Sequence, residues 1–247
     1  MSLKKTWNDQ YDGEKFSSLK DKNLFFLETD AIISHIHKSL LNFSKKEEEI
    51  IILELGCGTG ELLRQISRYL HNSFSFNLNQ KNIGVDFSIN AIKQAKKNAS
   101  TNQKFICEDF LSYLVSQQSN SFDIIVTQRS IMAIMEEKLQ NQMLHEINRV
   151  LKKDGVGIFS ECFNSGLNHL NQLRKMANLD PIKKVWHSLY LDEKNFFQTF
   201  KDVEFNDFCS TYFLITRLIY PYFETPNHNQ DIHNIAAKLP NSGTNSF

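Results

Sequence analysis

Residues 50–60 read Ile-Ile-Ile-Leu-Glu-Leu-Gly-Cys-Gly-Thr-Gly, an apolar run that ends in a turn with a glycine at every second position. Glycine adopts positive φ at little cost and lets a ligand approach the backbone closely. Four apolar residues then recur with helical spacing: Leu62, Leu63, Ile66 and Leu70. The stretch therefore predicts a buried strand, a glycine turn and a helix, which together form a cradle for a nucleotide-like ligand.

Two details distinguish this cradle from the dinucleotide-binding one. The fingerprint G-x-G-x-x-G would place its third glycine at position 61, which is Glu61. In addition, Glu54 lies two residues before the first glycine, where its charge would repel a pyrophosphate but attract an ammonium group. An NAD-linked oxidoreductase is therefore the weaker alternative, and the site suits a ligand with cationic groups.

The spacing Glu54-x-Gly56-x-Gly58-x-Gly60 resembles motif I of the class I S-adenosylmethionine (SAM) methyltransferases. The resemblance extends in detail over about residues 45–165. It implies SAM as the cofactor and S-adenosylhomocysteine (SAH) as its product. The implied cofactor contacts at this turn are Glu54, Gly56, Cys57, Gly58 and Gly60.

A second predicted strand, residues 82–85, ends in Asp86. An acidic side chain at the carboxyl end of this strand can accept hydrogen bonds from both ribose hydroxyls of a nucleoside. The next residue, Phe87, is an apolar neighbour for adenine. Both positions agree with the order of landmarks in the family that the chain resembles.

The third predicted strand, residues 105–107, is followed by Glu108, Asp109 and Phe110. This segment resembles the acidic turn that binds adenine in the same family. The resemblance implies that Asp109 accepts a hydrogen bond from the exocyclic amine and that Phe110 packs on the base. Glu108 is the alternative carboxylate for that contact.

From residue 50 to residue 161 the pattern is five strands that alternate with helices, one of them over residues 136–151. Short connections between such units predict a parallel sheet. The expected fold is a doubly wound, mostly parallel α/β sheet, Rossmann-like. A chain of 247 residues fits one domain. We divide it into an N-terminal arm and helix (1–45), a SAM-binding half (46–162) and an acceptor-side half with inserts (163–247).

The two ends of the chain are less regular. We predict a helical arm that carries Trp7 and Tyr11, four residues apart and so on one helix face, and then a helix over about residues 29–43. Tyr11 either anchors the arm to the core or covers the methionine end of SAM. The family's usual antiparallel seventh strand has no clear counterpart near the C-terminus.

Beyond Cys162 the sequence predicts three further elements. A helix is expected over residues 167–179 and another over 211–220, since both show apolar residues with helical spacing. Residues 203–208 alternate like a sixth strand.

Composition makes several classes of function less favoured. Lys plus Arg equals Asp plus Glu at 28 each, so no global field gathers polyanions, and nucleic acid is disfavoured as a substrate. The four cysteines are far apart, which predicts neither a disulfide framework nor a zinc site. Without a signal peptide or an apolar run of membrane-spanning length, we expect a soluble, cytoplasmic protein.

The segment after the fourth strand, Thr127-Gln128-Arg129-Ser130, limits which acceptor groups and metal requirements we expect. It is not the Asn/Asp-Pro-Pro-Tyr type that grips a nucleobase or glutamine amino group. It also lacks a strand-end Asp to hold Mg²⁺, so we expect no metal. Gln128 is expected to line the methyl end of SAM. Arg129 is either a surface charge or a clamp for an anionic acceptor.

A general base is needed only if the acceptor must lose a proton. His187 is the first candidate because imidazole titrates near neutrality and because it follows the SAM-binding half. Glu161, at the carboxyl end of the fifth strand, is the second candidate. The alternative for His187 is a packed structural role beside Trp186.

Four further segments, residues 127–134, 168–174, 180–182 and 186–193, resemble more loosely a group of bacterial methyltransferases associated with cell-surface glycan biosynthesis. That resemblance implies a sugar or sugar-nucleotide acceptor. We therefore expect methyl transfer from SAM to a small molecule or glycan. The alternative from another class is a catalytically silent SAM-binding subunit that regulates a partner. The oligomeric state is left open.

Overall fold

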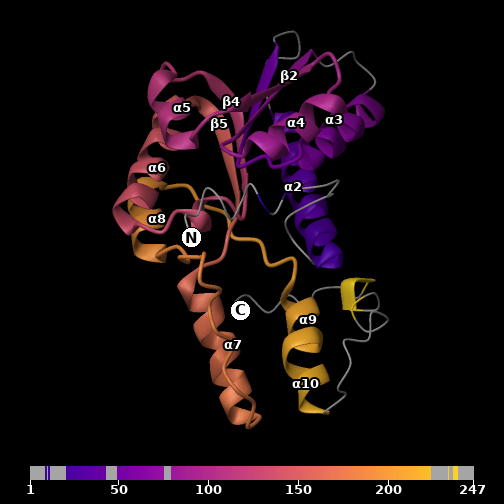
Figure 1. The fold of residues 1–247 in the computed structure, drawn as a ribbon, viewed down its shortest axis with the longest axis vertical. Helices are drawn as coiled ribbons and strands as arrows, with labels where there is room; N and C mark the ends of the chain where they lie inside the picture. Colours follow the sequence, from indigo (N-terminus) through magenta and orange to yellow (C-terminus); the bar gives the residue numbers. More distant parts are fainter. Residues whose placement is uncertain are drawn as a thin grey trace.

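A parallel sheet of strand order β3-β2-β1-β4-β5 forms the centre of this computed structural model (Figure 1). The structure describes Asp9, Tyr11, residues 21–42, 49–74 and 79–223, His233 and residues 236–238. The strands are β1 (Ile50–Leu55), β2 (Gln80–Asp86), β3 (Gln103–Cys107), β4 (Phe122–Gln128) and β5 (Leu151–Ser160). Because β1 lies between β2 and β4, the chain reverses its direction of winding there, which is where such sheets bind ligands.

Helices cover both faces of the sheet. They are α2 (Lys22–Asn42), α3 (Glu61–Ser73), α4 (Ile89–Lys97), α5 (Phe110–Ser116) and α6 (Glu137–Val150), with the short 3₁₀ helix η1 (Ile131–Ala133) after β4. Alternate residues of β1 enter different cores. Ile52 packs with α2, α3 and α4, whereas Leu53 packs with α5 and α6. The doubly wound α/β fold is confirmed.

The chain after β5 forms a separate group of helices beyond the carboxyl ends of the strands, which we call the acceptor lobe (Figure 1). It contains α7 (Asn164–Met176), α9 (Ser210–Phe213), the π-helical segment η2 (Leu214–Ile219) and α10 (Tyr220–Tyr222). Between them, α8 (Glu193–Thr199) returns to the sheet, where Phe196 joins the core with α5 and α6. Arg174 of α7 donates to the carbonyl of Arg217, which ties α7 to η2.

Two predictions for the ends of the chain differ from the structure. The helix expected from about residue 29 begins at Lys22, because Asp21 accepts a hydrogen bond from the amide of Leu24 (3.2 Å) and so caps an earlier start. The sixth strand over residues 203–208 is wrong: these residues are irregular. Their alternation reflects Phe205, which lies against the ring of Phe197 (5.4 Å between centroids), rather than pairing with a sheet edge.

The other predictions for this region agree with the structure. The helix over 211–220 is confirmed as the continuous run from α9 to α10, although its turns widen to π geometry in η2. The helix expected over 167–179 is α7, which begins and ends three residues earlier. Within the described residues the sheet has no antiparallel strand.

Candidate functional site

The glycine turn after β1 has the backbone that the sequence predicts. Gly56, Gly58 and Gly60 have φ of +77°, +51° and +76°, a region that residues with a side chain rarely adopt. Space is equally restricted, because a Cβ on Gly56 would lie 2.4 Å from Cβ of Ser130. The turn is therefore pressed against the loop that follows β4.

Tyr11 closes the other side of the turn. A Cβ on Gly58 would lie 2.7 Å from the Tyr11 hydroxyl oxygen, and the Tyr11 side chain is buried. Its carbonyl accepts a hydrogen bond from Nε2 of Gln94 (2.9 Å) on α4. Trp7, predicted to share a helix face with Tyr11, lies outside the described residues. Tyr11 thus belongs to the wall of the site.

Asp86 stands at the carboxyl end of β2 and faces the turn. One carboxylate oxygen accepts from the amide of Gly58 (2.9 Å) and the other from the amide of Ser88 (2.8 Å). Burial raises the pKa of Asp86, and these two hydrogen bonds act in the opposite direction. Each oxygen keeps one lone pair for a further donor.

Glu54 is the most unusual group of the site. Its side chain is buried, and Oε2 has no hydrogen-bond partner among the described residues. Burial raises the pKa of Glu54 well above its ordinary value, and the charge of Asp86 raises it further. A buried carboxylate oxygen without a donor is costly, so this position is suited to a ligand that brings a positive charge or an N–H group.

The Cys57 side chain is also buried, and burial raises the pKa of its thiol well above the ordinary value. Cys57 therefore stays a neutral thiol, and its amide donates to the carbonyl of Val85 (3.1 Å). Its contribution to the turn is structural and comes through the backbone.

Two aromatic rings and two carboxylates lie just after β2 and β3. The rings of Phe87 and Phe110 lie 6.4 Å apart, and Phe110 is buried in the core beside α5. Asp109 caps α5 by accepting from the amide of Ser112 (3.0 Å). The Glu108 carboxylate makes no hydrogen bond to a described residue, so both carboxylates named by the sequence remain candidates for the base contact.

At the end of β4 the structure adds a residue that sequence reasoning missed. Glu28 of α2 accepts from Nε2 of Gln128 (3.0 Å) and from Nε of Arg129 (2.6 Å), and Arg129 Nη2 lies 2.5 Å from the same oxygen. Burial raises the pKa of Glu28, and the Arg129 charge lowers it in part. Arg129 has φ of +54°, a strained value for a residue with a long side chain.

Glu161 organises the loop after β4. Its carboxylate accepts from the amides of Ser130 (3.0 Å), Ile131 (3.0 Å) and Met132 (3.2 Å), which are the first donors of η1. Burial raises the pKa of Glu161, and these three amides lower it. The carboxylate thus has three donors already.

His187 lies half-buried in the segment between α7 and α8, and its ring contacts Trp186 edge to face (5.3 Å between centroids). Two residues further on, Leu189 donates to the carbonyl of Met132 (2.8 Å), so this segment is fastened to the loop after β4. Sequence reasoning placed no role on Gln140 of α6. Its Nε2 donates to the carbonyls of Ile131 (3.2 Å), Ile134 (3.0 Å) and Leu189 (2.7 Å).

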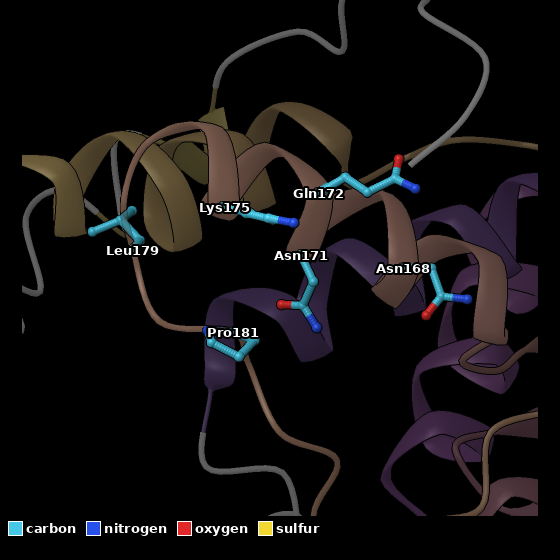
Figure 2. Close-up of a pocket in the computed structure, with 6 residues that line it drawn as sticks. All are labelled: Asn168, Asn171, Gln172, Lys175, Leu179 and Pro181. Carbon is cyan, nitrogen blue, oxygen red and sulfur yellow. The ribbon is translucent and has the colours of Figure 1, made fainter.

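A hollow with a volume of about 460 Å³ lies along α7, in the acceptor lobe rather than at the glycine turn. Figure 2 shows the side chains of Asn168, Asn171, Gln172 and Lys175 projecting from α7, with Leu179 and Pro181 on the segment that follows. Asn171 is engaged with the backbone of Ile182 through both amide atoms (3.0 and 2.7 Å).

Residues 46–208 match the family model of the methyltransferase domain. This chain belongs to the methyltransferase domain family. The enzyme class expected from the sequence is therefore confirmed.

Individual relatives are distant. A protein of Geobacillus sp. (strain WCH70) named "Putative methyltransferase" is 29% identical over 178 residues, 70% of this chain and 67% of that protein. An uncharacterized protein of Methanocaldococcus jannaschii is 30% identical over 109 residues, 44% of this chain but only 36% of its own length.

Among solved structures, magnesium protoporphyrin IX methyltransferase from Synechocystis PCC 6803, with bound SAH, has a TM-score of 0.53. It is 13% identical and covers 80% of this chain and 82% of its own. At that identity the likeness concerns the fold.

Two properties of the methyltransferase follow from its described residues. No group of three or more His, Cys, Asp or Glu side chains in that part of the chain is placed to hold a metal ion. None of the described helices combines the length and apolarity that crossing a membrane requires.

Proposed function

We propose that this methyltransferase binds SAM at the carboxyl ends of β1, β2 and β4 and transfers its methyl group to a small-molecule or glycan acceptor. The unpartnered Oε2 of Glu54, buried beside a glycine turn, supports this proposal most directly. SAM carries an ammonium group and a sulfonium, so it offers the positive charge that this oxygen lacks. A phosphate-bearing cofactor would instead meet two carboxylates, Glu54 and Asp86.

The described residues fit the remaining parts of SAM. Asp86 keeps a lone pair on each oxygen for the ribose hydroxyls, since each oxygen accepts only one amide. We assign the adenine to the space beside Phe87 and Phe110, with Asp109 or Glu108 accepting from its amine. The backbone from Gly56 to Gly60 allows close approach, because no Cβ stands between the turn and the ligand.

When bound, SAM supplies a methyl group that is already activated for displacement. The protein has mainly to orient the acceptor, which can contribute about 7–11 kcal/mol to lowering the barrier. We assign this task to Gln128 and Tyr11 on the cofactor side and to Arg129 at the border with the acceptor side. On the acceptor side it falls to the segment that carries Trp186 and His187.

For an acceptor that must lose a proton, we propose His187 as the general base. Glu161 is less suited, because its carboxylate already accepts three backbone amides and would release the loop if it were protonated. We therefore assign Glu161 a positioning role. An acceptor that is itself a carboxylate would need no base.

For the class of acceptor, we propose a hydroxyl-rich molecule. The hollow beside α7 supports a hydroxyl-rich acceptor, because the Asn168 and Gln172 side chains offer amide donors and acceptors next to apolar Leu179 and Pro181. The loose sequence resemblance to glycan-modifying methyltransferases points in the same direction.

Calorimetry with SAM, SAH and NAD tests the cofactor assignment. We expect micromolar binding of SAM and SAH and none of NAD; NAD binding without SAM binding would overturn the proposal. An assay of SAH production with a panel of nucleotide sugars, carboxylic acids and amines then tests turnover. SAM binding with no turnover of any acceptor would favour the silent SAM-binding subunit.

A further inference from the structure

We infer that Arg129 is an oxyanion-binding residue of the acceptor site. It would bind a carboxylate or phosphate of the methyl acceptor through the edge of its guanidinium that Glu28 leaves open. Glu28 is then a positioning residue, which fixes the guanidinium plane. The inference rests on the proposed function, because it assigns the anionic group to the methyl acceptor.

The backbone of Arg129 lies next to the glycine turn and at the end of the sheet. It follows the last residue of β4, and its amide donates to the carbonyl of Ser160 at the end of β5 (2.8 Å). The next residue, Ser130, is the one that presses against Gly56 of the cofactor turn. The side chain therefore starts where the glycine turn ends and the acceptor lobe begins.

The geometry of the ion pair leaves half of the guanidinium unused. An arginine has five N–H donors arranged in a rigid plane, with one fork at Nε and Nη2 and another at Nη2 and Nη1. Glu28 takes the first fork, with Nε at 2.6 Å and Nη2 at 2.5 Å from one carboxylate oxygen. Nη1 has no acceptor among the described residues, so the second fork is open to a planar or tetrahedral oxyanion.

The exposed fractions of the two side chains indicate which member of the Arg129–Glu28 pair is open to a ligand. The Glu28 side chain is 5% exposed and the Arg129 side chain 24% exposed. The second carboxylate oxygen of Glu28 is held from behind by Nε2 of Gln128 (3.0 Å). Arg129 is therefore the more accessible member of the pair, and we assign the contact with the acceptor to its guanidinium and a supporting role to the Glu28 carboxylate.

The groups around the pair add little negative charge that would repel an anion. Burial raises the pKa of the Cys162 thiol and raises that of Cys209 to about 12, so both thiols are neutral. Glu161 is offset by the three amides that it accepts. Burial alone would lower the pKa of Arg129, but the Glu28 charge raises it, so the guanidinium keeps its charge.

The strained backbone of Arg129 is a second, independent observation. Its φ of +54° places an arginine where glycine or asparagine would be easier to accommodate. Such strain persists where the surrounding structure requires one particular side-chain direction. Here that direction is toward Glu28 and the acceptor side of the loop.

Nuclear magnetic resonance of the full-length, SAH-saturated protein tests the inference through the arginine Nε–Hε signals. The probes are inorganic phosphate and acetate, added against sodium chloride of equal ionic strength. We expect the Arg129 signal, identified by its loss in Arg129→Lys, to shift saturably at millimolar concentrations of at least one probe. The two arms distinguish a phosphate from a carboxylate acceptor.

Two variants distinguish anion binding by Arg129 from a purely structural role, in which the Arg129–Glu28 pair only holds α2 in place. Glu28→Gln keeps the shape but removes the competing charge, so the anion should bind about tenfold more tightly, a change of about 1.4 kcal/mol. Arg149→Lys, which disturbs the Arg149–Glu146 pair of α6, is the matched control and should leave anion binding unchanged.

Three outcomes would overturn the inference. These are no saturable shift with either anion, an equal shift with chloride, or a Glu28→Gln protein that loses thermal stability while its anion affinity stays the same. SAH calorimetry on the same samples keeps the proposals apart: absence of SAH binding would remove the cofactor assignment, whereas loss of anion binding alone would remove only the role of Arg129.

Discussion

The cofactor half and the acceptor lobe differ in how far their helices are buried against the rest of the protein. Helix α3, which follows the glycine turn, buries four apolar residues against the sheet, whereas α7, which follows β5, buries none. The cofactor turn is held by backbone geometry and buried strands, which change little if a surface residue changes. The acceptor lobe presents a polar helix face whose residues can be exchanged without disturbing a core. Under the proposed assignment, the fold fixes the cofactor site and leaves the acceptor site adjustable.

The largest expected effect is a loss of methyl transfer without a loss of SAM binding, and it tests this difference most directly. His187→Ala should lower the rate of methyl transfer to a hydroxyl acceptor by about 10²- to 10⁴-fold. SAM affinity should stay nearly unchanged, because His187 belongs to the acceptor side. Single-turnover kinetics with SAM calorimetry on the same protein checks this. Full activity in a folded variant would assign the proton to another group or to none.

The converse change belongs to the cofactor half. Asp86→Ala removes a charged acceptor from the ribose, and since such hydrogen bonds contribute about 1.5–3 kcal/mol, SAM should bind about 10- to 150-fold more weakly. Phosphate or acetate binding at Arg129 should not change. Calorimetry with SAM and SAH measures the loss, and unaltered affinity in a well-folded variant would place the ribose contact elsewhere.

A pair of glycine substitutions compares the backbones of the two regions. Gly56→Ala must place a side chain at φ of +77° and 2.4 Å from Ser130. We expect a loss of about 1–3 kcal/mol in the free energy of unfolding from the strained backbone alone. Gly166→Ala lies within α7 and should instead gain about 0.5–1 kcal/mol, because alanine favours the helix. Urea denaturation measures both, and equal signs would contradict the comparison.

The smallest expected effect is a pH dependence of stability that arises from the protonation of Glu54. Folding raises the pKa of Glu54 above its ordinary 4.5, through burial and then through the charge of Asp86. Its contribution to stability is therefore fully present below pH 4.5 and is lost as the pH rises through the folded-state pKa. Without ligand, the wild type should lose stability relative to Glu54→Gln over that window.

A bound ammonium group favours the ionised carboxylate, so SAM binding should release a fraction of a proton in the same pH range. Calorimetry in two buffers of different ionisation enthalpy detects the release, and Glu54→Gln should abolish it. A wild type and variant with the same proton release would show that Glu54 does not meet the cation.

Sequence reasoning could name candidate residues for the cofactor half because most of those residues are local in the chain. A strand, a glycine turn and a helix occupy 50–70, and parallel strands bring Asp86 to the same edge without further information. Glu28 could not be found in this way, because it meets Arg129 across 101 residues and its own surroundings show only a helix. Gln140 is similar, since nothing near it in the sequence indicates that its amide joins three carbonyls.

The incorrect prediction of a strand over 203–208 has a related cause. Alternation shows that every second residue has an apolar neighbour, but not whether that neighbour is a sheet. Phe205 packs on the rings of Phe163 and Phe197, and the exposed Glu204 pairs with Lys38 of α2 (3.0 Å). The positions of His187 and Arg129 were identified as candidates, whereas their roles depend on an acceptor that the sequence does not name.

The loop after β4 is a wall common to both ligands. On one side Ser130 presses on Gly56, and on the other Met132 receives the amide of Leu189, two residues beyond His187. Any shift of this loop that SAM favours therefore also displaces the segment that carries His187. By thermodynamic reciprocity, the factor by which SAM alters acceptor affinity equals the factor by which the acceptor alters SAM affinity. One short stretch of backbone would then set the cooperativity between SAM binding and acceptor binding.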